Sequence, residues 1–546
     1  MFYKNVKVDT PSGKGVKILK KGYVYFCTKV WWDKETGHSK DNRLLIGKID
    51  EGNNNLMFPN DHYYEMFPNS KLLEEVPTID NYLHIGQYLA LRKASEIYGL
   101  YDNLRKNFPK LYNKIFALAI FAIDNQDNIS QHFEKWAFSN YCGLENNLSS
   151  GQISEIYSSI KQEDIESFFK DNIKSYQTYN KTIDRKLIAY DSTNQNTYSN
   201  NISYAEYGHA KINEGLPCIN TALFVDEITG IPLYYEHFYG SLLDKVQNKF
   251  TITKSKELGF KKLFFMMDRG YFSKENIDLL DEEEFGMMCP ETTEAVKTMI
   301  KNNSYKIKNK ENAYIDGYDI YGYTEKNTLF FNHEYDVYLY YDSKRAQDEI
   351  DTIHTKIDLM IKRLKTVKYY SKELKEAYEP FIIIEKVGLN KRSGFTYRKN
   401  DNAIQEEINK AGLFVILGNS SLSTKEMIEI ARARDTGEKA FKRIKSNFDL
   451  SKTYAHNQNV YYGKMFVSFI ALSIVETYRH FIKNYLNSIS SITTYTSLSE
   501  LSKLIIYKDI NSTNWKQRYA LTKKVKSILS LLNIDQNFIN DFISKI

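Results

Sequence analysis

Two aspartates each follow a short apolar run that is typical of a buried strand. Asp191 closes the run KLIAYD, and Asp268 closes the run KKLFFMMD. An ionised carboxylate in such a place loses solvation, so it needs a partner or a cation. Carboxylates that converge are tolerated when a divalent cation lies between them. The two acids therefore predict a metal site, provided that the fold brings them together.

A third acid comes from a helix near the end of the chain. Ser423 and Glu426 form a capping-box match, S-T-K-E, which predicts a helix from about Thr424 to Ser446, here called the capped helix. At the helical period, three of its charged residues lie within roughly 40° of one direction. These residues are Arg434, Glu438 and Lys445. Oxygen ligands alone favour Mg²⁺ or Mn²⁺ over zinc.

Each of these acids also has a simpler explanation when it is taken alone. An aspartate at a strand end is more often a turn or cap residue. An Arg–Glu pair four residues apart on a helix is usually a solvated surface pair. Only the combination of all three acids in one fold order favours a catalytic site.

The elements around the two aspartates follow a recognisable order. Three strand-like runs (186–191, 219–226 and 231–238) suggest an antiparallel meander, followed by a helix over 244–258. Residues 261–268 form a fourth strand, and a helix from 273 and a fifth strand at 285–289 follow. The order βββαβαβ is that of a ribonuclease-H-like α/β core, in which the first and fourth strands are neighbours. Asp191 and Asp268 would then converge at the sheet centre.

The rest of the chain divides by its periodicity. Alternating apolar residues in GYVYFCTKVWW and NRLLIGKID predict a β-hairpin, and three- and four-residue spacing predicts helices from about 82 to 174. The predicted organisation is a hairpin region (1–80), a helical region that could bind DNA (81–180), the first part of the core (181–290), a β-rich and helical insertion (291–420), the second part of the core with the capped helix (421–480) and a C-terminal helical region (481–546).

Composition excludes several classes of protein. With 42% hydrophobic and 26% charged residues, the chain is neither disordered nor a membrane bundle. The four cysteines form no C-x-x-C pair, which excludes a zinc ribbon. The most apolar run, Met465 to Val475, is too short to cross a bilayer and predicts a buried helix. The start has no apolar export segment, so we expect a cytoplasmic protein that contacts no membrane. The net charge of +6 is too small to identify a nucleic-acid binder.

These residues resemble a known family, the insertion-sequence transposases of the DDE class with the signature Y-x2-R-x3-E-x6-K. Arg434, Glu438 and Lys445 have the spacing of that signature, whereas Ala431 stands where the signature has Tyr. DRGYF (268–272) resembles the second catalytic segment of the family, and AYDST (189–193) resembles the first. The gap of 170 positions from Asp268 to Glu438 resembles the β-rich insertion of this branch.

The resemblance implies a bacterial DNA transposase that cleaves and joins the ends of an insertion sequence. Asp191, Asp268 and Glu438 would hold two Mg²⁺ or Mn²⁺ ions, and Arg434 and Lys445 would bind phosphates. Double-stranded DNA with terminal inverted repeats would be the substrate, bound by a homodimer. Three alternatives stay open: a nuclease of the same fold that only hydrolyses DNA, a domesticated protein that binds DNA without cutting it, and a surface-interaction protein.

Overall fold

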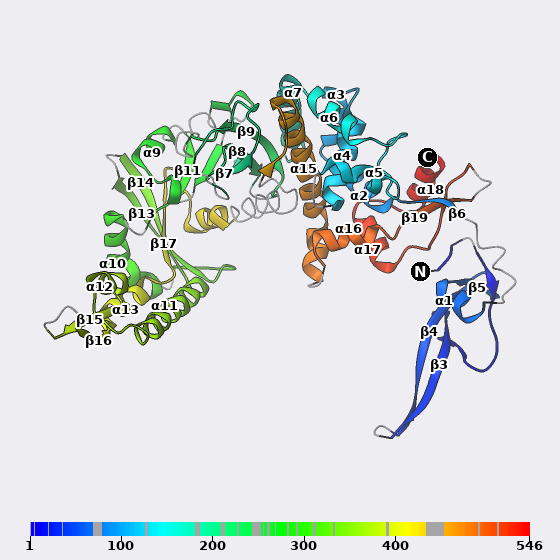
Figure 1. The fold of residues 1–546 in the computed structure, drawn as a ribbon, viewed down its shortest axis with the longest axis horizontal. Coiled ribbons are helices and arrows are strands. Elements are labelled where there is room, and N and C mark those ends of the chain that lie inside the picture. The colour runs from blue at the N-terminus through cyan, green and yellow to red at the C-terminus, as the bar shows by residue number, and fades with distance from the viewer. Residues whose placement is uncertain are drawn as a thin grey trace.

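The computed structural model describes most of the chain. The described residues are 2–4, 6–19, 21–34, 37–68, 79–125, 129–180, 186–208, 213, 215–226, 229–242, 253–254, 256–258, 263–267, 269–280, 283–290, 293–309, 313–330, 333–388, 393–432, 452–489, 492–509 and 513–546. A large sheet and the elements of the insertion lie at one end of the molecule, helices packed around α15 lie in the middle, and a small N-terminal sheet lies at the other end (Figure 1).

The large sheet combines strands from the middle of the chain in the order β12–β13–β14–β17–β11–β10–β7–β8–β9. Its strands are β7 (Lys186–Thr197), β8 (Cys218–Asp226), β9 (Pro232–Tyr239), β10 (Leu263–Met267), β11 (Glu284–Met288), β12 (Tyr314–Ile315), β13 (Ile320–Phe330), β14 (His333–Asp342) and β17 (Leu413–Gly418); the short β18 (Lys452–Thr453) also pairs with β7.

The strand directions confirm the predicted meander and the pairing of its first strand with the fourth, whereas most of the helix predicted over 244–258 lies outside the described residues. β7, β8 and β9 are antiparallel neighbours, and β10 is parallel to both β7 and β11. The first and fourth strands of the predicted core, β7 and β10, are therefore adjacent. All nine residues of β8 are buried, as expected for a strand with sheet or helix on every side.

The prediction that Asp191 ends its strand is wrong. β7 continues to Thr197, and its pairing with β8 runs from Ile188 to Asn196. Polar residues near the end of β7 have partners in the loop that precedes β8. Asn196, for example, donates from Nδ2 to the carbonyl oxygens of Asn213 and Leu216 at 2.9 and 3.2 Å.

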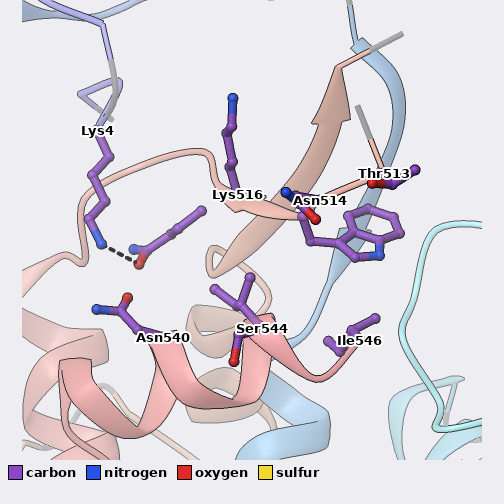
Figure 2. A pocket seen from close by; sticks show the side chains of 10 residues that line it. Lys4, Thr513, Asn514, Lys516, Asn540, Ser544 and Ile546 are labelled. Atoms are coloured by element: carbon purple, nitrogen blue, oxygen red, sulfur yellow. Dashed lines mark hydrogen bonds between the residues drawn. The ribbon is translucent and has the colours of Figure 1, made fainter. Parts of the chain in front are cut away.

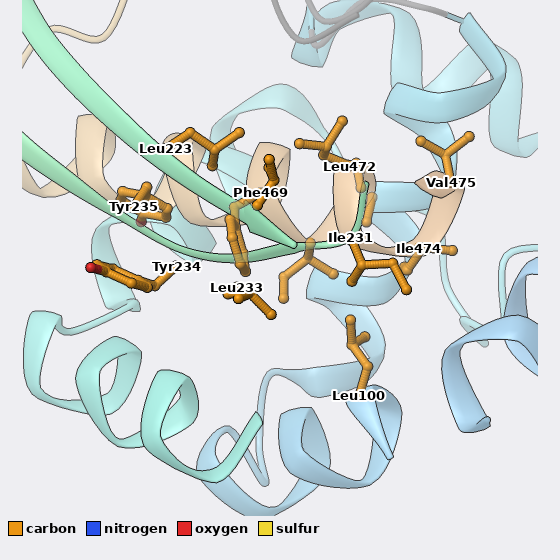
Figure 3. Packing of buried hydrophobic residues seen from close by; sticks show 14 of the residues in the cluster. Leu100, Leu223, Ile231, Leu233, Tyr234, Tyr235, Phe469, Leu472, Ile474 and Val475 are labelled. Atoms are coloured by element: carbon orange, nitrogen blue, oxygen red, sulfur yellow. The ribbon is translucent and has the colours of Figure 1, made fainter. Parts of the chain in front are cut away.

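The two faces of this sheet carry different helices. Phe265 and Met267 of β10 belong to the largest hydrophobic cluster, together with residues of α9 (Lys274–Leu280) and α10 (Glu294–Asn309). Phe264 and Met266 belong to a second cluster with the start of the capped helix. Helix α15 (Gln458–Ser488) packs on β9, and Figure 3 shows its apolar side chains beside those of β8 and β9.

The predicted N-terminal helices form and surround α15. They are α2 (Gly86–Glu96), α3 (Leu100–Asn107), α4 (Tyr112–Asn125), α5 (Phe133–Ala137), α6 (Ser150–Ser159) and α7 (Gln162–Tyr179). Helix α4 is buried at every position from Ile115 to Ile123, which explains its unbroken apolar sequence. Helix α15 contains the run Met465 to Val475 and is long and apolar enough to cross a membrane, but 83% of its apolar window is buried inside the protein. It is a core helix, as its sequence predicted.

The N-terminal hairpin is confirmed and belongs to a small sheet with the order β1–β5–β4–β3–β2. Its elements are β1 (Val8–Asp9), β2 (Val16–Leu19), β3 (Tyr23–Asp33), β4 (His38–Asp50) and β5 (Asn53–Pro59), followed by α1 (Asp61–Met66). A second small sheet joins distant parts of the chain through β6 (Ile79–His84), β19 (Ile505–Asp509) and β20 (Lys516–Gln517). The C-terminal helices are α16 (Thr494–Leu501), α17 (Lys523–Leu531) and α18 (Gln536–Ser544).

The insertion both extends the large sheet and forms a separate unit. Strands β14 and β17 continue the sheet beyond β11. The unit beside them has its own hydrophobic cluster and comprises α11 (Ser343–Leu364), α12 (Lys372–Tyr378), β15 (Ile382–Val387), β16 (Gly394–Lys399) and α13 (Asp401–Lys410). Helix α11 packs on this cluster through Ile353, Ile357, Met360, Ile361 and Leu364, which recur at helical spacing.

Candidate active site

Asp191 lies within β7, where its backbone pairs with that of Leu223 on β8. Its side chain is outside the described part of the chain. The other predicted site residues also lie outside the described residues: Asp268, Arg434, Glu438 and Lys445. The structure describes the scaffold that precedes each of them, namely β7, β10 and the first turns of the capped helix.

The register between β7 and β10 relates the two aspartates. In this parallel pair, Phe265 is opposite Ile188 and Met266 is opposite Ala189. Asp191 comes two residues after Ala189, and Asp268 comes two residues after Met266. Each acid therefore comes two residues after a member of the same strand pair, Ala189 and Met266.

The capped helix begins as its sequence predicts. Residues 424–432 are helical. The Ser423 hydroxyl accepts a hydrogen bond from the Glu426 amide at 3.2 Å, and the Glu426 carboxylate accepts from the Ser423 amide at 2.8 Å. This reciprocal pair satisfies two amides that have no partner within the helix.

Two tyrosines of the insertion hold the same helix end against the sheet. The Tyr338 hydroxyl, on β14, donates to the carbonyl oxygens of Ser420 and Leu422 at 2.9 and 3.1 Å. The Tyr340 hydroxyl donates to the carbonyl oxygen of Thr424 at 2.7 Å. Both rings are fully buried, so these bonds fix where the capped helix starts. The insertion therefore positions the start of the helix that is predicted to carry the third acid.

A pair of facing glycines lets the capped helix approach the sheet closely. Gly286 of β11 is opposite Gly418 of β17. A Cβ added at Gly286 would lie 3.0 Å from Met427 Sδ, and one added at Gly418 would lie 2.9 Å from Met427 Cε. Met427 is fully buried in the same cluster as Phe264 and Met266. The helix consequently covers the face of β10 to which Met266 points.

The capped helix contacts the sheet and the insertion as far as Arg432, the last residue described before the signature residues. Ala431, at the position of the signature Tyr, packs against the same cluster. The guanidinium of Arg432 lies over the Tyr318 ring, 5.2 Å from its centroid, and is 3.3 Å from Asp342 Oδ2. The small side chain at 431 thus serves the packing of the helix on the sheet.

A buried polar cluster lies under α15, on the strands next to Asp191. The Tyr461 hydroxyl of α15 donates to Gln195 Oε1 at 3.1 Å and is 3.3 Å from His237 Nδ1. The Thr221 hydroxyl is 3.1 Å from the same nitrogen. Burial lowers the pKa of His237 to about 3, so its imidazole is neutral at physiological pH. The cluster joins α15 to all three strands of the meander.

Within the part of the chain that the structure describes, no three His, Cys, Asp or Glu side chains are grouped as a metal site. The predicted ligands fall outside that part, so this result concerns other sites. A cavity of about 460 Å³ lies between the two termini and is lined by Lys4, Asn514, Gln517 and Asn540 among others (Figure 2). Its lining includes no residue of β7, β10 or the capped helix.

Sequence reasoning missed both the glycine pair and the polar cluster. A glycine inside the strand pattern FGMMC is a weak signal of close approach, and it could have pointed to Gly286. Gln195, His237 and Tyr461 come from three separate segments, and nothing in their spacing links them.

One of the comparisons with known proteins identifies a family. A family model described as "Transposase DDE domain" matches residues 182–474. Among solved structures, the piggyBac transposase synaptic complex with hairpin DNA is similar over 84% of each chain, at 8% sequence identity and a TM-score of 0.35. No curated protein matches the sequence.

Proposed function

Because the chain belongs to the family with a transposase DDE domain and is a DNA transposase, we propose that Asp191, Asp268 and Glu438 form its active site. The enzyme cleaves DNA and transfers strands, with divalent metal ions as the usual cofactor of the family.

The observation that carries this proposal is the parallel register of β7 and β10. If that register continues for two residues, positions 191 and 268 are neighbours on adjacent strands. Because side chains alternate along a strand, both acids would share the face of Phe264 and Met266. The capped helix packs on that face. Glu438 would come from the same helix, about two turns beyond the anchored segment.

The oxygen-only donor set fits Mg²⁺ or Mn²⁺, and we assign two ions to it. When bound, a metal pair supplies activation of the attacking hydroxyl and neutralisation of the leaving oxygen. Asp191 and Asp268 would provide ligands from the sheet and Glu438 from the helix. Arg434 would bind a phosphate bidentately, and Lys445 would bind one as a point charge.

We further propose that the core formed by β7 to β11 is ribonuclease-H-like, since its order β9–β8–β7–β10–β11 and its directions match the predicted βββαβαβ pattern. The enzyme would belong to the Y-x2-R-x3-E-x6-K branch of bacterial insertion-sequence transposases. It would act in the cytoplasm, as a homodimer on the terminal inverted repeats of its element.

The test compares Glu438→Gln with Lys445→Ala on a labelled duplex made from the DNA next to the reading frame. Glu438→Gln should bind the duplex normally but fail to cleave it in Mg²⁺, because it removes a ligand charge. Lys445→Ala should lower the salt dependence of binding by about one unit of slope, as for one lost phosphate contact. Wild-type protein in chelator should bind without cleaving.

Two outcomes would contradict the proposal. Full cleavage by both variants would assign Glu438 and Lys445 to a solvated helix face. Cleavage without joining of the ends to a target duplex would favour the nuclease that only hydrolyses.

A further inference from the structure

The N-terminal hairpin extends well beyond the sheet to which it belongs. β2 pairs with β3 only at Tyr23–Phe26, and β5 pairs with β4 only at Gly47–Asp50. The part that no third strand supports consists of residues 27–33 and 38–43, here called the distal ribbon. At the usual rise per residue its strands reach about 20 Å. Figure 1 shows it projecting from the N-terminal end of the molecule.

Three large apolar side chains are exposed together near the tip of the distal ribbon. Val30, Trp31 and Trp32 are 62, 39 and 65% exposed. They are opposite Asp41, Lys40 and Ser39 on β4. Because successive side chains of a strand point to opposite faces, the two indoles lie on the two faces of the ribbon. Adjacent exposed tryptophans are unusual for a free surface and indicate a partner.

The hairpin and its base also have a positive net charge. Residues 14–48 contain nine Lys and Arg against three Asp and Glu, a net charge of +6, which equals that of the whole chain. Two of these acids lie in ion pairs that also engage three of the cations: Asp33 pairs with Lys40, and Asp41 pairs with Lys17 and Arg43. The exposed Lys29 extends the basic surface toward the tip.

We propose that the distal ribbon is a DNA-binding arm that enters a groove of double-stranded DNA outside the active site. A two-stranded β-ribbon fits the major groove. Lysines at its base would bind phosphates, and the two indoles would contact bases or sugars. A protein partner fits less well, because stable interfaces bury about 800 Å² per partner and here only three apolar side chains are exposed, on a ribbon with a basic base. The proposal rests on the proposed function and adds a DNA contact to it.

The test measures binding of a labelled duplex from the DNA next to the reading frame, as a function of salt. Trp31→Ala/Trp32→Ala should weaken binding about tenfold or more, in the range of lost base contacts. Trp31→Phe/Trp32→Phe should retain most of the affinity. Lys29→Ala should lower the salt slope by about one. Two controls should bind as the wild type does: Leu359→Ala, a residue that is 52% exposed on α11, and Lys372→Ala, whose side chain is 81% exposed.

Two results would overturn the proposal. Unchanged affinity and salt slope in all ribbon variants would show that the arm does not touch DNA. A loss of dimer in sedimentation, with unchanged DNA binding, would assign the ribbon to a second copy of the chain. Failure here is distinguishable from failure of the active-site proposal, because Glu438→Gln tests cleavage while the ribbon variants test binding.

Discussion

Replacing either member of the glycine pair by alanine should displace the capped helix. At Gly418 the new methyl group would lie 2.9 Å from Met427 Cε and 3.0 Å from the carbonyl oxygen of Phe285. At Gly286 it would lie 2.9 Å from Met266 Sδ and 3.0 Å from Met427 Sδ. Ordinary contacts between apolar atoms are about 3.5–4.0 Å, so the helix or the methionines must move by about 0.5–1 Å.

The expected cost follows from two opposing effects. Overpacking a buried site costs about 1–3 kcal/mol. Alanine in place of glycine in a strand returns about 0.5–1 kcal/mol of backbone entropy. We therefore expect Gly418→Ala to lower the free energy of unfolding by about 1–2 kcal/mol. Gly286→Ala should cost less, because both of its close neighbours are flexible methionine side chains rather than backbone.

The effect on catalysis should exceed the effect on stability. Moving the capped helix by this distance would move Glu438 relative to the sheet, and a misplacement of about 1 Å can cost a hundredfold in rate. Single-turnover cleavage by Gly418→Ala should therefore fall by about tenfold to a hundredfold, while DNA binding changes little. Urea denaturation and cleavage of end DNA provide the two measurements.

A matched control and a double variant make this prediction specific. Gly394 starts β16, and an added Cβ there would meet nothing within 4 Å. Gly394→Ala should therefore leave cleavage unchanged and raise the free energy of unfolding by at most about 0.5–1 kcal/mol. Met427→Ala removes the atoms that the new methyl group meets, so the costs of Gly418→Ala and Met427→Ala should be less than additive. Wild-type stability and cleavage in Gly418→Ala, or strict additivity in the double variant, would refute the close packing of the helix.

Three further predictions concern the scaffold of the site. Ser423→Ala removes the helix cap and should lower the free energy of unfolding by about 1 kcal/mol; an unchanged urea midpoint would rule out a stabilising cap. Tyr461→Phe takes a partner from Gln195 and His237 and should cost about 1–3 kcal/mol in the same assay, whereas wild-type stability would contradict the buried cluster. Because burial holds the pKa of His237 at about 3 instead of 6.5, the unfolded chain binds a proton between these pH values that the folded chain does not. Stability should therefore fall with decreasing pH in this window, by about 1.4 kcal/mol per unit from this group. His237→Gln should flatten that decline, and identical slopes in both proteins would exclude His237 as its cause.

Local patterns in the sequence predicted the local structure. The hairpin, the N-terminal helices, the meander and the cap at Ser423 all depend on residues close together in the chain, and all form. The adjacency of β7 and β10 followed from the order of elements alone. The strand end at Asp191 was wrong, because the polar residues after it are held by partners on other segments.

Long-range pairing could not be predicted in this way. Nothing local indicates that β14 and β17 of the insertion extend the core sheet, that Tyr338 and Tyr340 bind the start of the capped helix, or that Tyr461 reaches His237. These contacts join residues far apart in the chain. They are, however, the contacts that set the position of the capped helix and of α15 on the sheet.

The convergence of Asp191, Asp268 and Glu438 on one metal site is the central claim, and metal-directed backbone cleavage tests it most directly. Fe²⁺ can replace Mg²⁺ at oxygen ligands, and with ascorbate and peroxide it generates hydroxyl radicals that cut the chain near the metal. A shared metal site predicts cuts close to all three positions. Excess Mg²⁺ should suppress these cuts, and Asp268→Ala should abolish them. Cuts near only one of the three acids, or cuts that persist in Asp268→Ala, would contradict a shared site.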